Sequence, residues 1–163
     1  MAHETSVSIG AHEMSFEIGK LARMAAGSCL IRYGDAVVLA GLSHGEPRAG
    51  LNFLPLTMDF REKMYAGGRI PGGFFKREGR PSEKEVLTMR MMDRPMRPLF
   101  PDGVGRDIQV QAWTLSSDCE IDTDVLAINA GSCAIATSDL AWNGPVGAVR
   151  IGRIEDEWIV NPT

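Results

Sequence analysis

The chain has 163 residues, an apolar fraction of 44% and a formal net charge of -4. These values are ordinary for a soluble globular domain with a real core, and they exclude a uniformly basic nucleic-acid-binding protein. Residues 61–106 nevertheless carry eleven Lys/Arg and six Asp/Glu, whereas the rest of the chain carries six and fifteen, so this segment predicts either a focused anion-binding site or a solvated charged helix and loop.

The first 60 residues predict only strands. Met14, Phe16 and Ile18 alternate with polar neighbours, which is the period of a half-buried strand. Gly34-Asp35 separates two segments rich in Val, Ile and Leu and predicts a hairpin. A loop is expected over 44–50. The expected strands are 5–9, 14–18, 28–33, 36–43 and 54–60.

Residues 65–80 contain five glycines and one proline and fit no regular element. They predict a long loop, and a loop of this length inside a domain is usually functional or disordered. Ser82 is expected to open the next helix, because Glu85 three residues later completes a capping box. Pro95 is expected to end or kink that helix near Arg94.

The C-terminal half mixes strands with one more helix. The cluster Asp122-Thr123-Asp124 predicts an N-cap for a helix over 125–137, whose small residues at spacings of three and four allow close packing. The expected strands are 108–115, 146–151 and 158–160. About eight strands and two helices predict an α+β fold with a mixed or mostly antiparallel sheet. Two helices are few for such a sheet, so we expect a domain that is incomplete at its C-terminal side.

The glycine-rich loop carries two adjacent aromatic residues, Phe74 and Phe75, followed by the cations Lys76, Arg77 and Arg80. It matches neither the P-loop nor the dinucleotide-binding pattern. Aromatic rings can stack on bases, and the cations can hold backbone phosphates, so the loop predicts binding of single-stranded RNA. The alternative is that the two rings anchor the loop in the core.

Arg90, Arg94 and Arg97 lie at spacings of four and three, which places them on one face of the predicted helix. Three like charges repel one another there, and guanidinium groups match phosphate oxygens in bidentate geometry. The pattern therefore predicts a phosphate clamp. The alternative is a solvated face paired with Glu83, Glu85 or other acids.

The remaining candidates are weaker. The histidines have no metal-ligand spacing, and the acidic residues between 118 and 124 favour helix capping over a magnesium site.

Cys29, Cys119 and Cys133 form no CxxC pair, which predicts reduced, partly buried thiols in a cytosolic protein. Residues 1–5 do not resemble a secretory signal, and the longest apolar run, 36–42, is too short to span a membrane.

Residues 69–82 read RIPGGFFKREGRPS, and residues 93–101 read DRPMRPLFP. These two long motifs resemble the first core domain of bacterial polynucleotide phosphorylases. Residues 53–57, 143–147 and 161–163 also look like that family, so the resemblance covers essentially the whole chain. It implies that residues 1–163 form the first ribonuclease PH-like core domain, with the ribonuclease PH-like fold.

The resemblance also implies an activity: reversible, phosphate-dependent 3′-to-5′ phosphorolysis of RNA to nucleoside diphosphates. The full enzyme would be a ring-shaped homotrimer in the cytoplasm, with RNA-degradosome partners and no membrane contact. Its Mg²⁺ ligands and phosphate-binding serines would lie in a second core domain, so no metal ligand is expected in this chain. Inorganic phosphate would be the co-substrate.

Two sets of site residues are carried over from the family motifs. Phe74, Phe75, Lys76 and Arg77 would line the channel constriction and grip RNA, with Lys76 replacing the usual arginine. Arg94 and Arg97, with Arg90 one turn earlier, would lie beside the active site. The alternatives are a non-catalytic RNA-binding subunit of an exosome-like ring and a ribonuclease PH-type enzyme that trims transfer RNA.

Overall fold

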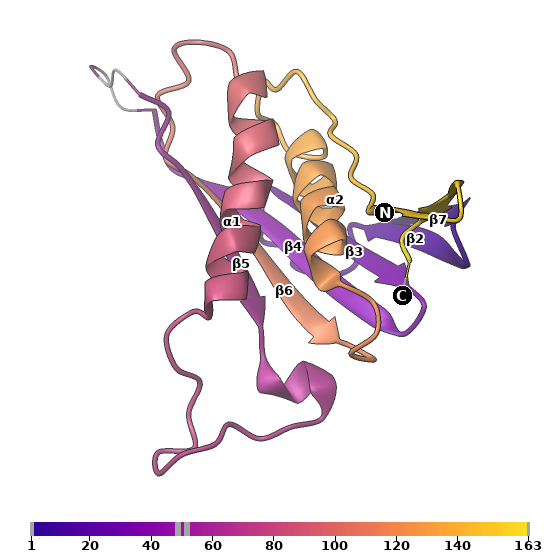
Figure 1. Ribbon diagram of the computed structural model, residues 1–163. Helices are drawn as coiled ribbons and strands as arrows, with labels where there is room; N and C mark the ends of the chain where they lie inside the picture. The colour runs from indigo at the N-terminus through magenta and orange to yellow at the C-terminus, as the bar shows by residue number, and fades with distance from the viewer. Residues whose placement is uncertain (1, 48–49, 51–52, 163) are drawn as a thin grey trace.

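Six strands pair into one mixed sheet in the computed structural model, which describes residues 2–47, 50 and 53–162 (Figure 1). Their order is β1-β2-β3-β4-β6-β5, antiparallel except for the parallel β5–β6 pair, so the expected mixed sheet is confirmed. Part of the expected loop over 44–50, and Met1 and Thr163, lie outside the described residues. The strands are β1 (His3–Ile9), β2 (His12–Ile18), β3 (Gly27–Tyr33), β4 (Ala36–His44), β5 (Leu56–Glu62) and β6 (Ile108–Ser116).

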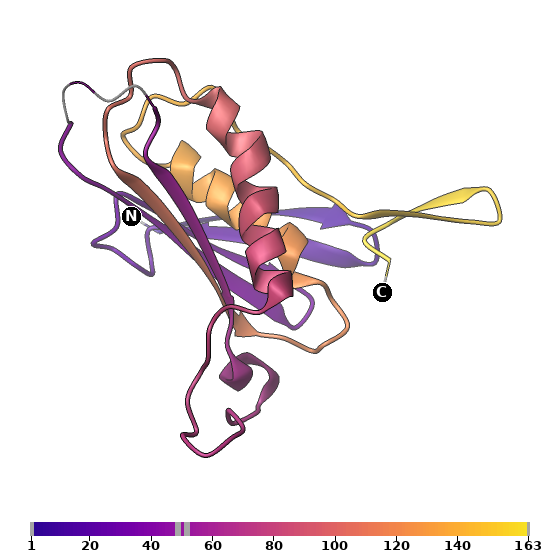
Figure 2. The same cartoon turned by 60° about the vertical axis from the view of Figure 1, so that its left-hand side comes forward.

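Two helices, α1 (Glu83–Met96) and α2 (Thr123–Ala136), cover one face of this sheet (Figure 2). α1 packs on β5, whereas α2 packs on β3, β4 and β6. The strand alternation expected from the sequence is clearest in β6, where Ile108, Val110 and Ala112 are fully buried and Gln109 between them is exposed. The core therefore lies between the helices and the inner face of the sheet.

The small residues of α2 allow the close packing that the sequence predicts. Ala127, Ala130 and Ala134 are fully buried. A Cβ added to Gly131 would lie 3.0 Å from Cε of Met92, so α1 and α2 touch at this glycine. A side chain at position 131 would therefore require the terminal methyl group of Met92 to shift by a few tenths of an ångström.

The connection from β5 to β6 contains α1 and two short 3₁₀ helices, η1 (Met64–Gly67) and η2 (Arg97–Leu99). The sequence prediction of a continuous loop from residue 65 missed η1. α1 also runs one residue beyond Pro95, to Met96, and continues directly into η2. A proline in the last turn removes only one intrahelical hydrogen bond, so it ends the helix slightly later than we expected.

The closing hairpin is shifted from its predicted position. The strands are β7 (Ile151–Ile154) and β8 (Glu157–Val160), so the strand expected over 146–151 is wrong for most of its length. Its backbone pairs with α2 instead: the amides of Val146 and Ala148 donate to Ser132 Oγ at 2.8 Å and Asn129 Oδ1 at 2.9 Å. These side chains occupy the hydrogen-bonding groups that a neighbouring strand would need.

No helix among the described residues is long and apolar enough to cross a membrane.

Candidate nucleic-acid interface

The glycine-rich loop projects from the end of β5, below the helices in Figure 1, and is fastened at its base. The amide of Ser117 donates to the carbonyl of Ala66 at 3.0 Å, which ties η1 to the end of β6. The amide of Met64 donates to Oε1 of Glu78 at 2.9 Å, which brings the two sides of the loop together. Glu78 is therefore an anchor of the loop, a role that its position among cations in the sequence does not reveal.

Phe74 and Phe75 both face solvent within this loop. Their exposed fractions are 94% and 78%, so neither ring anchors the loop in the core, and that alternative is wrong. The rings contact each other edge to face, with centroids 5.4 Å apart. Exposed large apolar side chains of this kind often mark a binding surface, and two bare ring faces are suited to stacking on bases.

Lys76, Arg77 and Arg80 are exposed beside the phenylalanine pair. Lys76 has a positive φ of 51°, which turns the backbone directly after the two rings. The structure shows no ion pair for these three cations within the described part of the chain. Their charge is therefore available to an external anion.

α1 starts at the capping box that the sequence predicts. The Glu85 amide donates to Ser82 Oγ at 3.2 Å, and the Ser82 amide donates to Glu85 Oε2 at 2.6 Å. The second carboxylate oxygen of Glu85 accepts from the amide of Glu62 at 2.9 Å, so Glu85 also joins α1 to the end of β5. Burial alone would raise the pKa of Glu85, but these amide hydrogen bonds hold the pKa below its ordinary value.

Glu85→Gln is expected to lower the free energy of unfolding by about 1–2 kcal/mol at pH 7, because one of the two backbone amides loses its acceptor and the other keeps only an uncharged one. Since folding lowers the pKa of Glu85, its contribution is present above the pKa of the unfolded chain and is lost as the pH falls through the folded pKa. Urea unfolding at several pH values measures this. Glu83→Gln, in the same helical turn, is the control and should change little. A stability difference that is the same at pH 7 and at low pH would contradict the assignment.

The three arginines of α1 and η2 divide into two kinds. Arg90 and Arg94 are exposed, and no ion pair of either is found within the described residues. Arg97 instead donates to both carboxylate oxygens of Asp93, at 2.6–3.1 Å. These hydrogen bonds raise the pKa of Arg97. Asp93 is thereby occupied by Arg97 and does not neutralise Arg90 or Arg94.

Arg97 also has a structural role that the sequence does not predict. Its Nη1 and Nη2 donate to the carbonyls of Leu54 and Leu56, both at 2.9 Å. These bonds fasten the end of α1 to the start of β5. The sequence motif predicts all three arginines on one side of the helix, but within the described residues Arg97 is held by protein groups, whereas Arg90 and Arg94 have no ion-pair partner and can bind a ligand.

The acidic residues before α2 are largely occupied as well. The sequence predicts that the cluster at Asp122 caps the helix, but the side chain of Asp122 makes no capping hydrogen bond. It pairs with Arg150 instead. Asp124 pairs with the same guanidinium at 2.7 Å and accepts from the amide of Val125. The structure groups no three His, Cys, Asp or Glu side chains into a metal-binding cluster within the described ranges.

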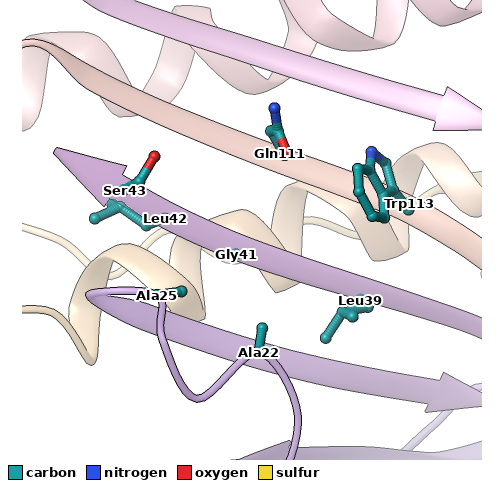
Figure 3. A pocket seen from close by; sticks show the side chains of 8 residues that line it. All are labelled: Ala22, Ala25, Leu39, Gly41, Leu42, Ser43, Gln111 and Trp113. Carbon is teal, nitrogen blue, oxygen red and sulfur yellow. The ribbon is translucent and has the colours of Figure 1, made fainter.

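Another exposed aromatic residue, Trp113, lies on the face of the sheet that the helices leave uncovered. It borders a cavity of about 190 Å³ between β4, β6 and the segment before β3 (Figure 3). The cavity lining contains no charged side chain among the described residues, so it offers nothing to hold a phosphate. The glycine-rich loop is therefore the better candidate for a nucleic-acid interface. The lining residues are Ala22, Ala25, Leu39, Gly41, Leu42, Ser43, Gln111 and Trp113.

Residues 10–141 match the model of the 3′ exoribonuclease family, domain 1. The chain belongs to the 3′ exoribonuclease family. Its relatives in this family include a polyribonucleotide nucleotidyltransferase of Koribacter versatilis, 58% identical over 155 residues that make up 94% of this chain and 19% of the relative. One of Desulfitobacterium hafniense is 49% identical over 98% of this chain and 22% of the relative. The chain thus spans about a fifth of the length of these 3′ exoribonuclease family members.

The fold also matches a solved structure, rice (Oryza sativa) Rrp46, with a TM-score of 0.67. The match covers 91% of this chain and 67% of the rice chain, with 21% sequence identity. At this identity the likeness shows the fold alone. The expected α+β, ribonuclease PH-like fold is confirmed by this match together with the family assignment.

Proposed function

We propose that the chain is part of an enzyme that degrades RNA by phosphorolysis from the 3′ end. Inorganic phosphate attacks the terminal phosphodiester, and a nucleoside diphosphate leaves. The names of the relatives support this activity. The observation that carries the proposal in this chain is the exposure of Phe74 and Phe75 beside Lys76, Arg77 and Arg80.

Within this proposal the loop grips the RNA strand. Phe74 and Phe75 stack on successive bases without selecting their identity, as suits an enzyme that degrades any sequence. Lys76, Arg77 and Arg80 hold the backbone phosphates and make binding dependent on salt. Glu78 keeps the base of the loop closed through the bond that it accepts from the Met64 amide.

Arg90 and Arg94 act at the reacting phosphate in this account. Their unneutralised charges stabilise the negative charge that develops on the phosphoryl oxygens in the transition state. Arg97 serves the same site indirectly, because its bonds to Asp93 and to the carbonyls of Leu54 and Leu56 hold the helix end in place. We therefore assign Arg97 a positioning role.

We further propose that residues 1–163 form the first of two core domains in a cytoplasmic homotrimer that can join an RNA degradosome. Mg²⁺ is expected to be bound by the second core domain. Asp122 and Asp124 do not fit the ion, because both pair with Arg150. No step of the reaction is assigned to a metal in this chain.

The test is to incubate the full-length protein that contains this chain with single-stranded RNA, with and without inorganic phosphate. Chromatography should detect nucleoside diphosphates only when phosphate is present. Release of nucleoside monophosphates without phosphate would contradict phosphorolysis. RNA binding without any release would favour the alternative of a non-catalytic RNA-binding subunit.

A further inference from the structure

Two of the three cysteines meet between the sheet and α2. Cys29 lies on β3 and Cys133 on α2, and the two side chains are near enough for each to change the pKa of the other. The backbones of β3 and α2 approach closely at this point: a Cβ added to Gly27 would lie 2.0 Å from the carbonyl oxygen of Ala134. A strand and a helix that pack this closely can be joined by one disulfide, whose Cα atoms need a separation of about 4.4–6.8 Å.

The two thiols differ in access to solvent. Cys29 is fully buried, whereas Cys133 is half-buried and lines an apolar cavity of about 500 Å³ between β1, β2 and α2. Phe16, Ile18 and Val146 form part of the same cavity wall. A small oxidant that enters the cavity therefore meets Cys133 before it can reach the buried Cys29.

The interaction between the thiols also distinguishes their reactivity. Cys29 lowers the pKa of Cys133, whereas Cys133, together with burial, raises the pKa of Cys29. The thiolate is the reactive form of cysteine, so Cys133 is the better nucleophile of the two. This agrees with the order of access.

We propose that Cys29 and Cys133 are a peroxide-sensitive dithiol site that closes to a disulfide. The Cys133 thiolate attacks one oxygen of a hydroperoxide, whose O–O bond breaks, giving a sulfenic acid on Cys133 and hydroxide from hydrogen peroxide. The sulfur of Cys29 then attacks the sulfur of Cys133. The S–S bond forms, the S–O bond breaks, and the hydroxyl group leaves as water with the proton of Cys29.

The closed disulfide would join β3 to α2 across the core. It would leave the loop cations and the arginines of α1 unchanged, because those groups lie on other elements. The site is thus independent of the proposed phosphorolysis, and a thiol reductant reopens it.

The experiment uses the full-length protein with Cys119→Ser, because Cys119 is exposed and would otherwise compete for the oxidant. After treatment with hydrogen peroxide, unreacted thiols are alkylated and the protein is digested with trypsin under non-reducing conditions. We expect peptide 24–32 joined to peptide 107–150, and release of both by dithiothreitol. In Cys29→Ala, Cys133 should accumulate as a sulfenic acid that dimedone traps.

Two results would overturn the proposal. One is oxidation of Cys133 to sulfinic acid, in the protein that retains Cys29, without any linked peptide. The other is a linked peptide that forms in urea but not in the folded protein. Cys133→Ala provides the matched control, since buried Cys29 should then stay reduced at the same peroxide concentration.

Discussion

Arg94→Ala in the full-length protein is expected to lower kcat for phosphorolysis by a factor of roughly 100–1000, the usual cost of removing one charge-stabilising donor from a transition state. Arg94 is exposed, and no ion pair holds it within the described residues, so its loss should change the free energy of unfolding by less than about 0.5 kcal/mol. Steady-state kinetics with saturating RNA and phosphate, together with urea unfolding, measure both effects. Arg90→Ala should lower kcat by the same factor or by less, again with little change in the free energy of unfolding.

Arg97→Ala is the contrasting variant for this prediction. It removes the ion pair with Asp93 and the bonds to the carbonyls of Leu54 and Leu56. Because the side chain is 40% exposed, we expect a modest loss of stability, about 1–2 kcal/mol after allowance for solvent screening. An unchanged rate in Arg94→Ala would remove Arg94 from the site. A loss of stability in Arg94→Ala as large as in Arg97→Ala would reduce its role to a structural one.

Phe74→Ala and Phe75→Ala are each expected to weaken binding of long single-stranded RNA by roughly 5- to 150-fold, which corresponds to about 1–3 kcal/mol for each stacked base. Both rings are exposed, so the fold should be unaffected. Fluorescence anisotropy with labelled RNA measures the affinity. Processive degradation of long RNA should fall in parallel.

Two control variants separate stacking from general loss of apolar surface. Ile70 is 80% exposed in the same loop but has no ring, so Ile70→Ala should keep most of the affinity. Phe74→Tyr keeps a stacking face and should also bind normally. Equal losses for Ile70→Ala and Phe74→Ala would contradict base stacking and leave only a general effect of the loop.

Local patterns in the sequence predicted much of the fold. The Ser82–Glu85 capping box and the alternation in β6 were found as expected, because both depend on residues close together in the chain. The strand expected over 146–151 was wrong because Asn129 and Ser132, distant in sequence, bond the backbone amides of that segment. Side chains that replace a strand partner leave no periodic signal.

The candidate site was predicted only in outline. The spacing of Arg90, Arg94 and Arg97 places them on one face, but the carbonyls that bind Arg97 come from the start of β5, about forty residues earlier. No local pattern identifies which arginine finds such a partner. Likewise, a pair of adjacent phenylalanines is more often a core anchor than an exposed platform, and the exposed fractions show that here both rings face solvent.

The most direct measurement is photo-crosslinking of single-stranded RNA containing 4-thiouridine to the full-length protein, followed by trypsin digestion and mass spectrometry. We predict that, among peptides of this chain, 70–76, which contains Phe74 and Phe75, carries the main crosslink and that Glu78→Ala, which frees the loop base, weakens it. A main crosslink at Trp113 on the uncovered sheet face, with none in peptide 70–76, would contradict the account.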